Sequence, residues 1–81
     1  MSAAGKPWAT HLATVMKLMR EIRNMGLREH ARELKLSPAT LSRIERGYGC
    51  DVDTLMLISQ KTGAKVSTLL GLSNSAGDNN G

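Results

Sequence analysis

The chain has 81 residues, a formal net charge of +4, one cysteine and two aromatic side chains, Trp8 and Tyr48. This length allows one domain close to the lower limit for a single hydrophobic core, and the scarcity of aromatic rings argues against modules that stack unpaired nucleic-acid bases. A lone cysteine forms no internal disulfide, no Cys/His cluster indicates a metal, and no apolar run is long enough for a signal peptide or a membrane span, so we expect a cytoplasmic protein.

The positive charge is concentrated in the middle of the chain. Between Lys17 and Arg46 there are eight Lys or Arg residues against four Glu. Such an excess favours a polyanionic partner, of which nucleic acid is the obvious one. The alternative is a generally basic surface that serves only solubility.

Residues 1–9 are predicted to form a flexible arm, because most of them are small and they include Gly5 and Pro7. Two roles remain open for this arm. Lys6 could lie along a DNA backbone, or Trp8 could dock on the body of the protein.

From Thr10 onward the spacing of apolar residues predicts a first helix. The helix is expected to end near Asn24, since asparagine tolerates the left-handed conformation that often follows a helix. The apolar stripe along this helix contains Leu12, Val15, Met16, Met19 and Ile22.

Two short amphipathic helices with a tight turn between them are predicted next. Gly26 can cap the first, which runs to about Leu34, while Ser37 and Pro38 begin the second as N-cap and first helical residue. Gly47 ends it. Two helices joined this tightly are typical of a helix-turn-helix, whose second helix enters the DNA major groove.

A fourth helix is predicted after a short loop, with Asp51 or Asp53 as its cap. Its four consecutive apolar residues, 55–58, exceed one helix face, so we expect burial against more than one partner surface. Gly63 ends this helix, and a short last helix or turn follows up to Leu72.

The predicted domain therefore spans residues 10–72. The tail, residues 73–81, carries one charge and no large apolar side chain. Such a composition cannot offset the entropy lost on ordering, so the tail is expected to be disordered.

The segment ARELKLSPATLSRIERG, within this five-helix order, resembles the lambda-repressor-like family of helix-turn-helix regulators, the Cro and phage-repressor class. The resemblance covers roughly residues 12–72 and implies an all-α fold with the helix-turn-helix in helices two and three. Its most telling residues are Ala31, Leu36-Ser37, and the run from Leu41 to Gly47.

Four positions depart from the family pattern. Gly26-Leu27 replaces a Thr or Ser followed by Gln, so a side-chain contact to phosphate is lost while the backbone N–H groups remain. Lys35 replaces the usual turn glycine; a left-handed lysine costs of order 1 kcal/mol, unless the turn is built differently. His30 stands where the family commonly buries leucine, and we expect it to be neutral at the edge of the core.

Position in the motif assigns the DNA contacts. Arg43 is the main candidate for direct readout, because its planar fork can bond guanine O6 and N7, and the alternative is a salt bridge to a nearby carboxylate. Glu45 is expected to be structural or directed toward phosphate. The full base-contact set is Ser37, Pro38, Ala39, Thr40, Ser42 and Arg43, and the phosphate-contact set is Leu27, Arg28, Arg46 and Tyr48.

One such domain covers half an operator, so a two-fold homodimer on a palindrome is expected. The interface is predicted from apolar residues of the last two helices, namely Met56, Leu69, Leu70 and Leu72.

The sequence thus predicts a double-stranded-DNA-binding transcriptional regulator, in the first place a repressor. Family members with short chains include phage repressors, antitoxins and restriction-modification controllers. The alternative is a protein-interaction module on the same fold, such as an antitoxin that holds a toxin. No enzyme, metal site, cofactor or membrane association is expected, because Cys50 with His11 or His30 is not a catalytic arrangement by spacing and no phosphate-binding glycine loop is present.

Overall fold

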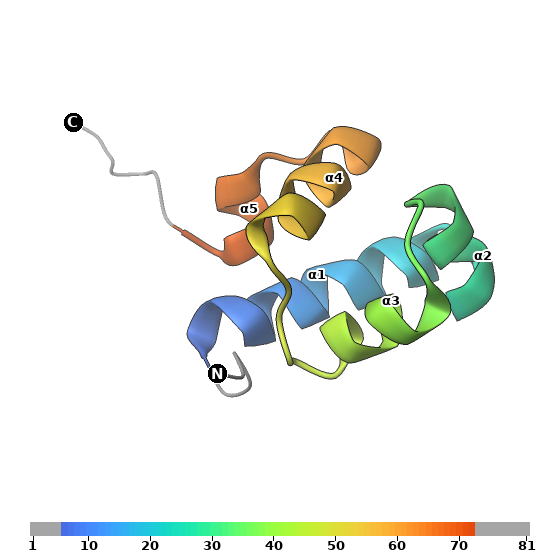
Figure 1. Cartoon of the computed structure of the whole chain (residues 1–81), viewed down its shortest axis with the longest axis horizontal. Helices are drawn as coiled ribbons and strands as arrows, with labels where there is room; N and C mark the ends of the chain where they lie inside the picture. Colours follow the sequence, from blue (N-terminus) through green and yellow to red (C-terminus); the bar gives the residue numbers. More distant parts are fainter. Residues whose placement is uncertain (1–5, 73–81) are drawn as a thin grey trace.

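Five helices make up the fold of the computed structural model, which describes residues 6–72 (Figure 1). No strand occurs in this range. α1 runs across the middle of the molecule, with α3 on one side, α4 and α5 on the other, and α2 at its C-terminal end. The predicted all-α, five-helix architecture is confirmed. The helices are α1 (Pro7–Ile22), α2 (Leu27–Glu33), α3 (Pro38–Glu45), α4 (Val52–Thr62) and α5 (Val66–Leu70).

α1 begins three residues before its predicted start. Pro7 is its first residue and follows Lys6, whose backbone is extended. Proline fits the first helical position, where its missing N–H has no helical partner to lose. Ala9 is fully buried and Trp8 packs against the core, so these residues belong to the domain and the predicted arm boundary at residue 9 was wrong. Residues 1–5 of the arm and the tail, 73–81, lie outside the described residues.

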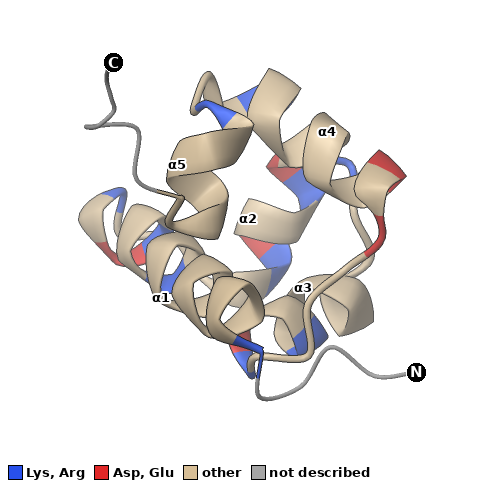
Figure 2. Ribbon diagram, turned by 90° about the vertical axis from the view of Figure 1, so that its left-hand side faces the viewer, with Lys and Arg blue, Asp and Glu red and all other residues tan. Residues whose placement is uncertain are grey.

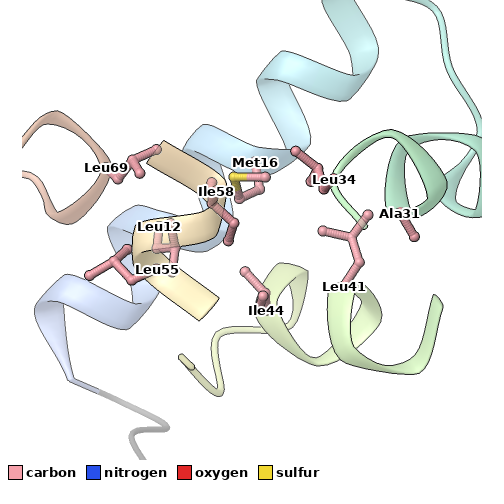
Figure 3. Packing of buried hydrophobic residues seen from close by; sticks show 9 residues of the cluster. All are labelled: Leu12, Met16, Ala31, Leu34, Leu41, Ile44, Leu55, Ile58 and Leu69. Atoms are coloured by element: carbon pink, nitrogen blue, oxygen red, sulfur yellow. The ribbon is translucent and has the colours of Figure 1, made fainter. Parts of the chain in front are cut away.

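One hydrophobic core holds all five helices together (Figure 3). Each helix contributes at least one buried aliphatic side chain to it, so the helices cannot separate without exposing that surface to water. The cluster consists of Leu12, Met16, Ala31, Leu34, Leu41, Ile44, Leu55, Ile58 and Leu69.

The helix ends follow the local signals in the sequence. Asn24 and Lys35 adopt positive φ angles of 55° and 63° after α1 and α2. Gly63 is the left-handed cap of α4, and Asp51 caps its start by accepting the Thr54 N–H at 2.8 Å. The predicted stop at Asn24 is confirmed, and of the two alternatives at Lys35 the chain adopts the left-handed conformation.

Two apolar residues lie elsewhere than their spacing predicts. Ile22 belongs to the apolar stripe of α1 but is 80% exposed, because it sits in the last turn and no other helix packs over it. Leu69, predicted at a dimer interface, is fully buried in the core, because α5 lies against α1.

Within the described part of the chain, no helix combines the length and apolar character that crossing a bilayer requires.

Candidate nucleic-acid interface

The start of α3 is fixed by its own side chains. The Ser37 hydroxyl oxygen accepts the Thr40 N–H at 3.1 Å, and the Ser37 hydroxyl donates to Thr40 Oγ1 at 2.8 Å. Pro38 occupies the first helical position. This capping makes α3 begin abruptly after the turn, so that Pro38 and Ala39 are exposed at its tip.

α3 separates a buried face from an outward face. Leu41 and Ile44 are fully buried and attach the helix to the core. Ala39 and Arg43, four residues apart, share the opposite face and are exposed, while Ser42 is half-buried on its flank. The small side chains before Arg43 leave the tip of the helix narrow enough to approach a groove closely.

The Arg43 side chain makes no hydrogen bond or ion pair with the residues that the structure describes. The salt bridge considered as an alternative for it is not formed. Arg43 borders a shallow hollow of about 220 Å³, which is also lined by Thr40, Gly49, Cys50, Asp51 and Thr54. Its guanidinium group is therefore free to bind a partner.

A bidentate salt bridge holds the C-terminal end of α3 against α1. Arg20 Nε donates to Glu45 Oε2 at 2.9 Å, and Arg20 Nη2 donates to Glu45 Oε1 at 3.0 Å. Arg20 Nη1 also donates to the carbonyl of Met25 at 3.3 Å. The hydrogen bonds to Glu45 raise the pKa of the Arg20 guanidinium. With its side chain only 8% exposed, Glu45 positions the helix and is not available to DNA.

The turn between α2 and α3 is held by backbone hydrogen bonds. The Leu36 N–H donates to the Ala31 carbonyl at 2.9 Å, and the Lys35 N–H donates to the Arg32 carbonyl at 3.1 Å. This pattern requires a left-handed residue at Lys35 and satisfies the last carbonyls of α2. Ala31, fully buried, is small enough to let α3 pack close to α2.

The predicted phosphate-contact residues lie at the start of α2 and just after α3. Arg46 and Tyr48 lie just after it, with the Arg46 guanidinium carbon 5.4 Å from the centre of the Tyr48 ring. Arg28 is exposed in the first turn of α2 and makes no ion pair within residues 6–72. The Leu27 side chain packs against the core, so only its backbone could face a phosphate.

Acidic residues flank this surface at the start of α4 (Figure 2). The hydrogen bonds from Thr54 lower the pKa of Asp51, which therefore stays charged beside the hollow at Arg43. Burial, with the charge of Asp51, raises the pKa of the Cys50 thiol to about 11. Cys50 is therefore protonated at neutral pH and not activated as a nucleophile. Among residues 6–72, no group of three or more His, Cys, Asp or Glu side chains could hold a metal.

The structure does not bring the predicted dimer residues together. Leu70 and Leu72 line an apolar hollow of about 380 Å³ together with Trp8 and Val52. Met56 is 57% exposed but lies on a different, shallow hollow on α4. Of the residues predicted at the dimer interface that are not buried, Leu70 and Leu72 therefore lie on one surface and Met56 lies on another.

Sequence reasoning did not identify two contacts at this site. The Arg20–Glu45 bridge joins residues 25 apart in the chain, and no local spacing signals it. The Arg46–Tyr48 pair is local, and its signal was a cation two residues before the chain's one tyrosine. Both contacts limit the movement of side chains that lie within five residues of Arg43 in the chain, namely Glu45, Arg46 and Tyr48.

Comparison with protein families agrees with this geometry. A family model described as helix-turn-helix matches residues 16–73, which include α2, the turn and α3. Searches among curated proteins and among solved structures gave no match. The family match covers more than half of the 81 residues, so the chain belongs to the helix-turn-helix family of DNA-binding regulators of the Cro and phage-repressor type.

Proposed function

We propose that this protein is a transcriptional repressor of the cytoplasm that binds a specific double-stranded DNA operator through the major groove. One observation carries the proposal: Arg43 extends from the outward face of α3 with no partner among the described residues, one turn after the small residue Ala39. A free guanidinium one turn behind a narrow helix tip matches the two acceptors that guanine presents in the major groove. No enzymatic activity is proposed.

The other outward residues of α3 support Arg43 in reading bases. Thr40 can contact a thymine methyl group, Pro38 and Ala39 can offer apolar contact, and Ser42 lies on the flank. The Ser37 hydroxyl already donates and accepts hydrogen bonds within the helix start, so it contributes mainly by fixing the helix.

The surrounding basic groups are proposed to hold the phosphates. Arg28 is exposed in the first turn of α2, the helix before the proposed reading helix, and Arg46 is exposed at the C-cap of α3. The Tyr48 ring beside Arg46 limits the directions that the guanidinium can take. Backbone N–H groups near Leu27 complete this set, since the first N–H groups of a helix lack helical partners.

We further propose that two copies bind a palindrome. One reading helix covers only a half-site, and a two-fold dimer places two such helices one helical turn of DNA apart. The apolar hollow at Leu70 and Leu72 favours this end of the fold as the contact between copies, with Val52, 71% exposed, beside it.

Selection of bound sequences from random double-stranded DNA, followed by a footprint, tests the function. We expect a palindrome with half-sites one helical turn apart and a conserved guanine in each half. Recovery of unrelated sequences would contradict sequence-specific binding and favour a protein-interaction module on the same fold, for which a co-purified protein partner is the direct sign.

A further inference from the structure

A second hollow lies away from the proposed reading face of α3. Its volume is about 250 Å³, and it opens between the end of α1, the middle of α2 and the end of α4. None of the residues assigned to DNA contact lines it. The lining residues are Met19, Ile22, Arg23, His30, Lys61 and Thr62.

His30 contributes a buried polar group to this hollow. Its side chain is fully buried, and neither ring nitrogen has a hydrogen-bond partner among the described residues. Buried polar side chains nearly always have such a partner, so an unpaired imidazole requires a specific explanation. A neutral imidazole carries one N–H donor, and no described residue accepts a hydrogen bond from the donor of His30.

The charged groups of the hollow are cations. Lys61 is exposed and makes no ion pair within residues 6–72. Arg23 Nη2 donates to Glu33 at 2.8 Å, which leaves the other guanidinium nitrogens of Arg23 without an assigned acceptor. The hollow therefore offers donors and positive charge, and its complement is an anion.

One wall of the hollow is apolar. Ile22 is 80% exposed, the largest exposure among the large hydrophobic side chains of the described chain, and Met19 lies one turn before it. Burying such a side chain under a ligand removes apolar surface from water. Three unsatisfied groups of different chemistry thus meet at one place: an unpaired imidazole at His30, a free ammonium at Lys61 and an exposed aliphatic side chain at Ile22.

We propose that this hollow binds a small organic monocarboxylate with an apolar body. The carboxylate accepts from Lys61 and from the N–H of His30, and the apolar body covers Ile22 and Met19. A volume of about 250 Å³ is below the range for drug-sized ligands, which indicates a smaller molecule. Each ring nitrogen of His30 exposes less than 1 Å², so the carboxylate reaches it after rotation of a flexible lining side chain such as Met19.

The site goes beyond the proposed DNA binding and is tested on the free, full-length protein. The isotope-labelled chain is titrated with benzoate and with hexanoate while NMR signals of the His30 ring and the Ile22 and Met19 methyl groups are followed. We expect saturable shifts with Kd on the order of 1 mM or below. Acetate, which lacks the apolar body, and benzamide, which lacks the charge, serve as matched probes and should bind at least about tenfold more weakly.

Variants then separate the two polar contacts. Lys61→Gln should weaken benzoate binding about fivefold, as expected for an exposed ion pair, and His30→Leu about tenfold, because a buried charged hydrogen bond is lost. Lys65→Gln removes an exposed lysine outside the hollow and should change nothing. Absence of saturable shifts with both carboxylates, equal binding of benzamide, or unchanged binding by Lys61→Gln would each overturn the proposal.

Discussion

The guanidinium of Arg43 extends into solvent from a helix whose other long side chains are engaged. Glu45 is paired with Arg20, and Arg46 lies over Tyr48. Because Arg43 alone among these has no partner in the described chain, it does not have to break an internal contact before it binds a base. This freedom makes it the residue on which proposed sequence preference should depend most.

Substitution of Arg43 by alanine tests this dependence. We expect Arg43→Ala to cost about 1–3 kcal/mol on the preferred operator and to relax sequence choice at one position of each half-site, because two hydrogen bonds to one base are lost. Binding measured by fluorescence anisotropy over a set of operator variants gives both effects. The matched control is Arg28→Ala, which should weaken all sequences alike and reduce the salt dependence. Unchanged operator affinity in Arg43→Ala contradicts the assignment.

His30 should make the stability of the fold dependent on pH. Burial lowers its pKa below the usual 6.5; Glu45 and Glu33 act in the opposite direction, while Arg23 and Arg20 act in the same direction as burial. The unfolded chain therefore takes up a proton at a higher pH than the folded chain does. The contribution of neutral His30 to the free energy of unfolding is therefore fully present above pH 6.5. It is lost as the pH falls from 6.5 to the pKa of His30 in the folded chain.

Urea unfolding at about pH 7.5 and about pH 5.5 measures this dependence. The wild-type protein should be less stable at the lower pH, whereas His30→Leu should lose most of that difference. Asp51 does not interfere, since its pKa is lowered from 3.8 and it stays ionised at both values. An equal pH dependence in the two proteins would show that another group is responsible.

At the scale of the elements, the bridge between Arg20 and Glu45 determines how α3 is held on α1. The pair is mostly buried, with side chains 23% and 8% exposed. Glu45→Gln should lower the free energy of unfolding by about 2 kcal/mol, because two hydrogen bonds from Arg20 to a charged acceptor are weakened in a partly buried site. Chemical denaturation measures the change.

A second salt bridge provides the control for that experiment. Arg23, the C-cap of α1, pairs with Glu33 of α2 at 2.8 Å, but their side chains are 52% and 47% exposed. Glu33→Gln should therefore change stability by less than about 0.5 kcal/mol. Equal losses in Glu33→Gln and Glu45→Gln would contradict a special role for the buried pair.

The turn between α2 and α3 carries backbone strain at Lys35, whose φ is +63°. Lys35→Gly should stabilise the domain by about 0.5 kcal/mol, since the left-handed penalty removed exceeds the added freedom of the unfolded chain. Thermal unfolding should show a rise of about 2–4 °C with DNA binding retained. Asn24→Gly, at φ +55°, is the control and should gain less, because asparagine tolerates this conformation. A loss of stability in Lys35→Gly would show that the lysine side chain itself stabilises the turn.

At the scale of the whole molecule, two leucines three residues apart have different roles. Leu72 is 58% exposed beside the apolar hollow, whereas Leu69 is fully buried in the core. Leu72→Glu should weaken binding to a full palindrome about tenfold and leave binding to an isolated half-site unchanged, because it disturbs only the proposed contact between copies. Analytical ultracentrifugation with each DNA gives the stoichiometry.

Leu69→Ala is the contrasting change. It should lower the free energy of unfolding by about 2–5 kcal/mol, as truncation of a buried leucine does, and weaken binding to both DNAs. Equal binding of the palindrome by wild type and Leu72→Glu would place the contact between copies elsewhere on the surface.

The features that the sequence by itself predicted correctly depend on interactions between residues that are close together in the chain. The caps at Ser37 and Asp51, the proline at the start of α3 and the left-handed stop at Asn24 act within a few residues of the helix ends that they define. Apolar spacing likewise gave the number and order of helices. The start of α1 was predicted three residues late because Pro7 was interpreted as a helix breaker, although the first helical position accepts proline.

Tertiary structure decided the remaining features, because burial depends on what distant segments place opposite a side chain. The sequence pattern could not distinguish Ile22, exposed beyond its neighbours, from the buried Met16 on the same stripe. It also could not predict that Glu45 pairs with Arg20 of α1, or that both ring nitrogens of His30 have no hydrogen-bond partner among the described residues. The sequence therefore identified the helix that we propose reads DNA, and only packing determined which of its side chains are held by the protein and which have no partner among the described residues.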